Sequence, residues 1–232
     1  MRRTMSGAQL IQLKQDLMVL GDGWDKCLGG IPKTGIVAMW GGSGNGKSAA
    51  AMSLCSEICK FCKVLYVAAE EGYGPSLQNT ARRYDMAAAK TRFQVSIDTY
   101  DELVERLDKR ESAHVVVIDS PQAMGLKKSQ FQELRQKYGN RKLIIFVCQA
   151  DGKQPKGKVA QDIKFMADIK IWVSGFKAFS HGRFYGETGE KVIWDEGARR
   201  AYGRDNKEVN NGDTTEDTGT DQRLAEVPAM VG

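Results

Sequence analysis

The chain has few of the residues that build metal sites and disulfide frameworks, and it has no long apolar run. Its 232 residues include only two histidines and five cysteines. Two histidines give zinc coordination little support, and an odd number of cysteines does not suggest a disulfide framework. No run of 18 apolar residues occurs, which excludes a transmembrane helix, and Arg2 and Arg3 precede no apolar stretch of the secretory type. We therefore expect a protein of the reducing cytoplasm with no membrane partner.

Three of the cysteines lie close together in the sequence. Cys55, Cys59 and Cys62 have the spacing of the iron–sulfur loop of radical enzymes. The same spacing of four and three residues places them on one face of a helix, together with Met52 and Ile58. Because a free cysteine packs as a small apolar residue, we interpret the three thiols as part of the core.

The net charge of +5 is unevenly distributed. Residues 204–232 hold seven acidic and three basic residues, a net charge of −4, which leaves +9 on residues 1–203. A basic body suits an anionic partner such as nucleic acid. The alternative is a basic surface that binds nothing. The acidic tail is suited to docking a protein partner, or to competing with nucleic acid for basic loops.

Short apolar runs alternate with helical patterns through the middle of the chain. Runs without polar alternation are typical of strands buried on both faces, and helices between them indicate a parallel sheet. The predicted strands are 36–40, 64–70, 114–119, 143–149 and 169–173, with 93–97 as an edge strand. The predicted helices are 47–60, 76–86, 100–110 and 129–138. The fold class is therefore α/β, with a mainly parallel central sheet flanked by helices.

The two ends of the chain differ from this middle part. Apolar residues predict a helix over 6–20 with Ser6 as its cap, followed by a loop over 21–35. Aromatic and glycine residues over 177–194 favour a C-terminal hairpin, and the polar residues beyond 203 are typical of disorder. We expect a lead-in segment over 1–35, a core over 36–203 and an acidic disordered tail over 204–232.

A glycine-rich segment joins the first predicted strand to the first long helix. Glycines let backbone N–H groups converge on a phosphate, and the start of a helix attracts the same anion. The lysine of such a loop reaches the β- and γ-phosphates, and the hydroxyl after it can bind Mg²⁺. The loop consists of Gly41, Gly42, Ser43, Gly44, Asn45, Gly46, Lys47 and Ser48. The sequence therefore predicts a site for ATP and Mg²⁺.

Acidic residues follow two other predicted strands. Asp119 ends the strand "HVVVID", where we expect the carboxylate that holds Mg²⁺. Ser120 follows it, so the group that activates water must come from elsewhere. Glu70 and Glu71 fall at the C-terminal end of another predicted strand, in "LYVAAEE", at the edge where ligand sites of open α/β sheets gather. Glu70 is the first candidate for the base and Glu71 the second; a solvated loop is the alternative.

These segments together resemble the RecA/RadA family of ATPases. The resemblance is carried by "LGGIPKTGIVAMWGGSGNGKS" (28–48), by Glu70 and by "VVVIDSPQAM" (115–124), and it covers residues 28–194. A phosphate loop alone is shared by many nucleotide-binding proteins. Its combination with Glu70 and with Asp119-Ser120-x-Gln122 is specific to this branch. The replicative helicases and the short phage recombination ATPases are similar too. The resemblance implies a RecA-like core.

The resemblance also implies roles for two further residues. Gln149, at the end of the strand "LIIFVCQ", matches the residue that senses the γ-phosphate, although a polar strand end is the alternative. Arg183 lies where the family has a basic residue that acts on the ATP of a neighbouring subunit. His181 stands where the family has a lysine, so an ordinary hairpin arginine remains the alternative.

In the family, two loops grip DNA, and here they correspond to residues 120–128 and 150–158. The second loop is basic, with no stacking aromatic residue, which favours contact with a phosphate backbone over base-specific recognition. The candidate DNA-binding residues are Lys127, Lys128, Lys153, Lys156 and Lys158. The resemblance implies an ATPase that assembles as a ring or filament with ATP between subunits and acts on DNA, single strands above all. The alternative is a nucleotide-switched interaction protein that moves no DNA.

Overall fold

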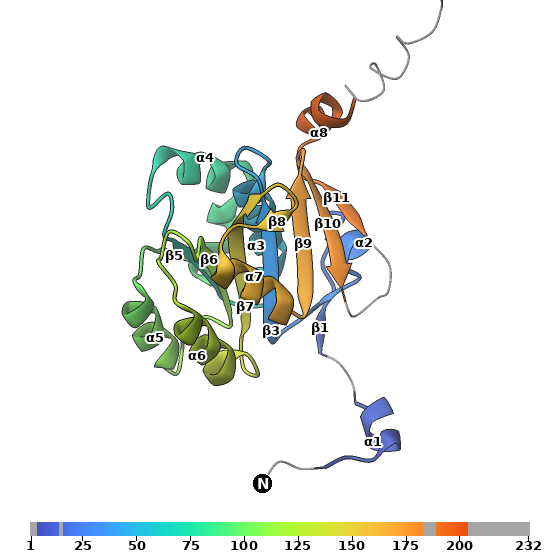
Figure 1. Cartoon of the computed structure of the whole chain (residues 1–232), viewed down its shortest axis with the longest axis vertical. Helices are drawn as coiled ribbons and strands as arrows, with labels where there is room; N and C mark the ends of the chain where they lie inside the picture. The colour runs from blue at the N-terminus through green and yellow to red at the C-terminus, as the bar shows by residue number, and fades with distance from the viewer. Residues whose placement is uncertain (1–3, 14–15, 183–188, 204–232) are drawn as a thin grey trace, which may run out of the picture.

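The computed structural model describes residues 4–13, 16–182 and 189–203. Among them, a nine-stranded sheet runs through the middle of the molecule in the order β11-β10-β9-β3-β7-β6-β4-β5, with β8 paired to β7 (Figure 1). Its strands are β3 (Gly35–Gly41), β4 (Val64–Ala68), β5 (Phe93–Ser96), β6 (Val115–Asp119), β7 (Leu143–Asp151), β8 (Gln154–Pro155), β9 (Ile169–Ser174), β10 (Lys177–Gly182) and β11 (Glu190–Val192).

The sheet is mostly parallel. All pairs from β9 through β3, β7, β6 and β4 to β5 are parallel, whereas β10 and β11 are added antiparallel. The apolar runs are therefore strands of a parallel sheet, as predicted, and 93–97 contributes the edge strand β5. The predicted C-terminal hairpin is confirmed by the pairing of Lys177 with Val192. Mixed α/β architecture with a mainly parallel central sheet is thus confirmed.

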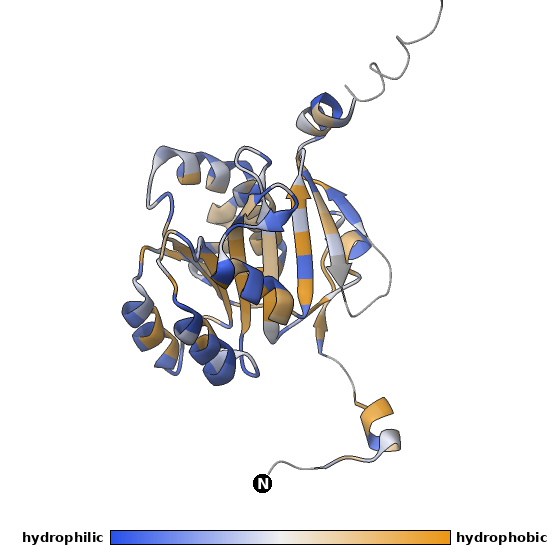
Figure 2. Cartoon of the chain, in the orientation of Figure 1, coloured by the Kyte–Doolittle hydropathy of each residue, from blue (hydrophilic) through white to orange (hydrophobic). Residues whose placement is uncertain are grey.

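Helices cover both faces of the parallel part. Their bounds are α3 (Lys47–Ile58), α4 (Pro75–Arg83), the 3₁₀ helix η1 (Met86–Arg92), α5 (Tyr100–Asp108), α6 (Lys128–Tyr138) and α7 (Lys158–Met166), whereas α8 (Asp195–Tyr202) lies beyond the turn between β9 and β10 (Figure 1). One core layer joins α3 to the sheet, and the other joins α5, α6 and α7 to its opposite face. The apolar sides of these helices face the strands (Figure 2). The four predicted helices are confirmed, whereas α7 and α8 were not predicted.

The lead-in segment differs from the prediction. The expected helix over 6–20 is wrong: α1 spans only Gly7–Ile11, with Ser6 as its cap, and Leu17–Met18 forms strand β1 instead. The apolar residues of α1 are exposed in the described structure, with Ile11 at 85%, whereas Met18 is fully buried in the core. Packing of Met18 therefore overrides the helical pattern.

The expected loop over 21–35 is also more ordered than predicted. It contains the helix α2 (Trp24–Leu28) and the strand β2 (Ile31–Pro32), which pairs with β1. Trp24 is fully buried, and its burial supplies the apolar area that holds this short helix on the core.

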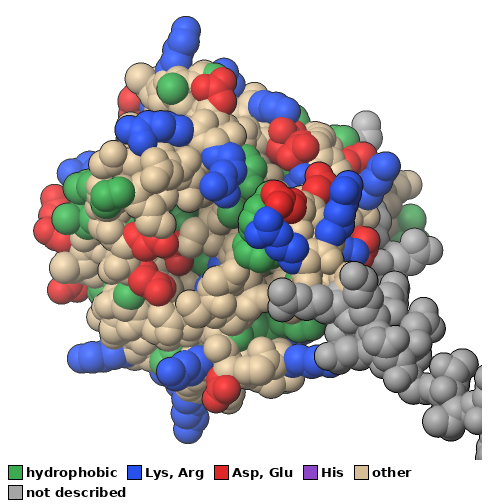
Figure 3. Space-filling model, turned by 90° about the horizontal axis from the view of Figure 1, so that it is seen from above, with side chains coloured by type: hydrophobic (Ala, Val, Ile, Leu, Met, Phe, Trp, Pro, Cys, Tyr) green, Lys and Arg blue, Asp and Glu red, His purple; other side chains and the backbone are tan. Residues whose placement is uncertain are grey.

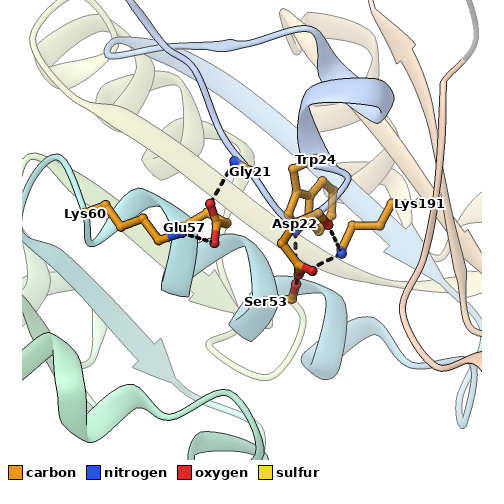
Figure 4. A network of polar contacts seen from close by, with 7 residues as sticks. All are labelled: Gly21, Asp22, Trp24, Ser53, Glu57, Lys60 and Lys191. Carbon is orange, nitrogen blue, oxygen red and sulfur yellow. Dashed lines mark hydrogen bonds and ion pairs between the residues drawn. The ribbon is translucent and has the colours of Figure 1, made fainter.

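A polar network ties this segment to α3 and β11 (Figure 4). The indole N–H of Trp24 donates to Ser53 at 3.0 Å, and Lys191 pairs with Asp22 at 2.8 Å. Glu57, almost completely buried, accepts from the backbone N–H of Gly21 at 2.8 Å and pairs with Lys60. Because each buried polar group of this network has a partner, the lead-in segment packs on the core without burying an unpaired charge of the network.

Two of the three clustered cysteines occupy the core as predicted, whereas Cys62 is half-buried and packs against it. Cys55 and Cys59 are buried in the layer that α3 forms with the sheet. Burial raises the pKa of the Cys59 thiol to about 12, so the reactive thiolate is disfavoured. The described part of the chain contains no helix long and apolar enough to cross a membrane.

Candidate functional site

The predicted site residues gather at one edge of the sheet, where the parallel strands end. Gly41 of β3 is the register partner of Gln149 of β7, and Asp119 ends the adjacent strand β6. The backbone N–H of Glu70, just after β4, donates to the carbonyl of Asp119 at 3.0 Å. Four strands distant in sequence therefore present these groups side by side. Figure 3 looks onto this edge from above, and Lys and Arg side chains rise at several places around it.

The glycine-rich loop takes a shape that larger residues would not allow. Gly44 and Gly46 have positive φ angles of 71° and 89°, a region that favours glycine. A Cβ on Gly41 would lie 2.1 Å from the carbonyl oxygen of Val173. The loop from Gly42 to Gly46 thus leaves its backbone bare of large side chains, the condition for N–H groups to approach an anion.

The turn between β9 and β10 holds this loop in place. The side-chain oxygen of Asn45 accepts from the backbone N–H of Gly175 at 2.7 Å, and the backbone carbonyl of Asn45 accepts from the backbone N–H of Phe176 at 3.2 Å. Its amide donates to the carbonyl of Ser43 at 3.2 Å. Asn45, predicted only as part of the loop, is therefore the residue that links the loop to the antiparallel strands.

The lysine and serine after the loop begin the long helix. Lys47 and Ser48 lie in the first turn of α3, and this first turn contains no acidic residue. The ammonium group of Lys47 donates to the carbonyl of Gly42 at 3.0 Å, so it lies over the loop. A positive helix start, a lysine above bare backbone and a nearby hydroxyl fit a phosphate group.

Asp119 is an almost completely buried carboxylate. The hydroxyl of Tyr66, on β4, donates to it. Burial, together with the neighbouring carboxylates Glu70 and Glu71, raises the pKa of Asp119 to about 6, whereas the hydrogen bond from Tyr66 and the charge of Lys47 act in the opposite direction. Acidic groups near a buried carboxylate have the ligand chemistry of a divalent cation, but no three His, Cys, Asp or Glu side chains of the described residues are grouped as a metal site. Mg²⁺ at Asp119 and Ser48 therefore stays a prediction.

Glu70 is the better placed of the two glutamates. Its carboxylate accepts from the side-chain amide of Gln149 at 2.9 Å, across the ends of β4 and β7. No such bond holds the side chain of Glu71 within the described residues, and both glutamates are exposed. The structure thus brings the two residues that resemblance assigns to water activation and γ-phosphate sensing into direct contact.

The two segments predicted to bind DNA also meet at this edge. The amide of Gln122 donates to the carbonyls of Gln149 at 3.3 Å and Lys156 at 3.0 Å. A groove of about 230 Å³ lies between the segments, and Lys156 and Lys158 contribute to its lining. The second segment is not a simple loop, because β7 continues to Asp151 and pairs with β8.

The remaining predicted lysines differ in their surroundings. Lys128 begins α6 and pairs with Asp162 at 3.1 Å, so its charge is partly neutralised. Lys127 is the exposed residue before α6. Lys153 lies at the tip of the β7–β8 hairpin, beside a second pocket. Arg183 lies outside the described residues, as does the tail over 204–232.

Two residues that organise the site received no role from the sequence: Tyr66 was missed, and Gln122 was named only as part of the resemblance. Tyr66 positions Asp119. The feature of the sequence that could have identified Tyr66 is its hydroxyl group inside the otherwise apolar run of β4. Gln122 joins the two basic segments, but nothing in the sequence shows that its partners are 27 and 34 residues away. No protein-family model and no curated protein sequence matches this chain.

Proposed function

We propose that this chain is a RecA-like ATPase that hydrolyses ATP with Mg²⁺ and couples hydrolysis to the binding of DNA, single strands in particular. The observation that carries the proposal is the contact between Gln149 and Glu70 at 2.9 Å. It joins the strand that leads into the basic β7–β8 hairpin to the glutamate beside the phosphate loop. A DNA strand on the hairpin and a nucleotide on the loop would therefore act on the same pair of side chains.

Each residue of the edge has a role in this reaction. The N–H groups of residues 42–46 and the ammonium group of Lys47 bind and orient the phosphates of the substrate. Ser48 and Asp119 hold Mg²⁺, which supplies positive charge to the phosphates when bound. Glu70 accepts the proton of the attacking water, and the amide of Gln149 fixes the orientation of that carboxylate.

Assembly is part of the proposal. The family to which this chain is similar works as rings or filaments with ATP between subunits, and Arg183 is the residue that would complete a neighbour's site. The lysines of the two basic segments would then line a common path for the phosphate backbone. The proposal thus includes self-association in the presence of ATP.

The test is steady-state hydrolysis of ATP with Mg²⁺, measured without DNA, with a single strand and with duplex. Lys47→Ala serves as the blank, and Lys63→Ala, an exposed lysine before β4, is the matched control. We expect stimulation by single strands of about tenfold, a usual size for coupling between two sites.

Two results would contradict the proposal at different points. Equal turnover by Lys47→Ala and the wild type would refute the ATPase assignment. Hydrolysis that depends on Lys47 but ignores both forms of DNA would favour the nucleotide-switched interaction protein.

A further inference from the structure

The antiparallel end of the sheet has an open face. The residues of β9 alternate between buried and half-buried, whereas the first six residues of β7 are all buried. Figure 1 shows α7 beside β9 on this face, with no helix in front of β9 and β10, and Figure 2 shows the alternating hydropathy of β9. Side chains in the middle of these strands are thus accessible.

A pocket of about 600 Å³ lies on this face, within the usual range of about 300–1,000 Å³ for ligand pockets. Trp172 of β9 and Phe179 of β10 are register partners with ring centroids 5.4 Å apart, and both are half-buried. Trp40 lies at the inner side of the pocket and is nearly buried. The pocket therefore offers two accessible aromatic faces side by side.

Three lysines surround these rings. Lys153 and Lys164 lie over the rings of Trp172 and Trp40, with the ammonium nitrogens 6.0 and 4.5 Å from the ring centroids. Lys170, from β9, completes the set, and none of the described lining residues is acidic. Within the described part of the chain, none of the three lysines forms an ion pair. The pocket thus combines stacking surfaces with positive charge that lacks a counter-charge.

The electrostatics of Lys164 agree with an anion site. Its ammonium group donates to the side chain of Gln154 at 2.7 Å. Partial burial lowers the pKa of Lys164, and the positive charge of Lys170 lowers it further. A phosphate between the two lysines would relieve this repulsion.

The pocket is also connected to the proposed catalytic edge. The indole N–H of Trp40 donates to the carbonyl of Lys153 at 3.1 Å, which fastens the tip of the β7–β8 hairpin to β3. Gly41, the next residue along β3, begins the phosphate loop. The pocket residue Trp40 and the first residue of the phosphate loop, Gly41, are therefore consecutive in the chain.

We propose that this pocket binds single-stranded nucleic acid, with unpaired bases stacked on Trp172 and Phe179 and the backbone phosphates bound by Lys153, Lys164 and Lys170. Stacking aromatics with lysines beside them are the usual means of holding single strands, because every unpaired base offers a π-face. A second copy of the chain fits less well, since covering three lysines that lack a counter-charge would be costly. The inference rests on the proposed function, and it adds a base-binding site that the basic hairpin alone lacks.

The test measures the binding of a labelled oligothymidylate of about 20 nucleotides by fluorescence anisotropy, several nucleotides more than one small site covers. A strand of equal length whose central nucleotides are abasic is the second probe. Trp172→Leu and Phe179→Leu keep apolar packing but remove the π-faces. We expect each to weaken binding of oligothymidylate by about 5-fold or more, and the double variant to bind both strands alike.

The lysines are tested through salt dependence. Lys164→Gln and Lys170→Gln should each reduce the slope of log affinity against log salt by about 0.7, the value for one phosphate contact with a single strand. Lys177→Gln is the matched control, because Lys177 lies on β10 outside the pocket and pairs with Glu190 at 3.3 Å. It should leave both affinity and slope unchanged.

The outcomes separate this inference from the proposed function. Variants that bind oligothymidylate as tightly as the wild type would overturn the pocket and leave the DNA-dependent ATPase in place. A wild type that binds no strand and hydrolyses ATP independently of DNA would overturn both. Variants that sediment as smaller species than the wild type, but bind oligothymidylate as tightly per protomer as the wild type does, would assign the open face to self-association instead.

Discussion

The parallel and antiparallel parts of the sheet differ in how they are covered. β7 lies between β3 and β6, and its residues from Leu143 to Cys148 are all buried, because helices pack on both faces. β9, next to the antiparallel hairpin, buries only every second residue. Both strands belong to one sheet, but β7 is apolar from Leu143 to Cys148, whereas β9 carries Lys170 and Ser174 at half-buried positions. The composition of each strand thus matches the number of its faces that helices cover.

This difference decides where each part can carry function. In the covered part, side chains along the strands are core, so polar chemistry is confined to the strand ends, as at Asp119 and Gln149. In the open part, positions midway along a strand remain accessible, as Lys170 and Trp172 illustrate. A reaction that needs side chains held in fixed positions suits the first arrangement, whereas a long flexible ligand suits the second.

The largest expected effect concerns the edge of the covered part. Glu70→Gln should lower ATP turnover by about 10²- to 10⁴-fold, the usual contribution of a general base, while ATP binding persists. Glu71→Gln is the matched control, because Glu71 follows Glu70 directly but does not contact Gln149. Steady-state hydrolysis and equilibrium ATP binding measure the two effects. Equal losses in both variants would show that the contact with Gln149 does not select the base.

Two phenylalanines on neighbouring parts of the sheet test the difference in coverage directly. Phe146 of β7 is fully buried and packs edge-on against Phe131 with a centroid distance of 5.5 Å. Phe146→Ala should cost about 3–5 kcal/mol of unfolding free energy through cavity formation. Phe179→Ala, on the open face, should cost about 1 kcal/mol, since that ring is only partly buried. Denaturant unfolding measures both, and equal costs would mean that the open face is packed.

The contiguous parts of this architecture could be predicted from sequence. The phosphate loop is a single segment between an apolar run and a helix, and unbroken apolar runs identify strands covered on both faces. Glu70 and Gln149 were each expected at a strand end. Their direct contact spans 79 residues and depends on β4 and β7 ending at the same edge.

The open pocket could not be predicted in the same way. Its two stacking rings come from different strands and its lysines from the hairpin, α7 and β9. The basic segment 150–158 contains no aromatic residue, so sequence reasoning argued against stacking there. Register between β9 and β10, which places Trp172 opposite Phe179, supplies the missing rings. In the lead-in segment, burial of Met18 and Trp24 likewise decided the structure against local pattern.

Asp119 shows how much unfolding free energy the protein loses by burying an ionisable group in the covered part of the sheet. Its pKa is raised from 3.8 to about 6 by burial, so the folded state disfavours its ionised form. The penalty is absent below about pH 3, grows as the pH rises through the two pKa values, and is complete above about pH 7. Without Mg²⁺ at pH 8, Asp119→Asn should therefore be more stable than the wild type by at most about 3 kcal/mol.

Thermal unfolding across pH measures this difference. The advantage of Asp119→Asn should shrink strongly near pH 4 and vanish below about pH 3, because the wild-type carboxyl is then neutral in both states. The Tyr66 hydroxyl can still donate to the amide oxygen, so the variant keeps this hydrogen bond. A variant that is less stable than the wild type at pH 8 would contradict the idea that this carboxylate is kept for function.

Two helix caps with the same chemistry give the smallest contrast. Thr99 and Ser6 each cap a helix through a reciprocal pair of bonds, with Glu102 and Gln9. α5 covers the sheet and buries Leu103 and Leu107, whereas α1 buries none of its residues. Thr99→Ala should cost about 1 kcal/mol, and Ser6→Ala should leave the unfolding free energy unchanged. A measurable loss in Ser6→Ala would show that α1 packs on the folded core in solution, because a cap stabilises the protein only where its helix is coupled to global unfolding.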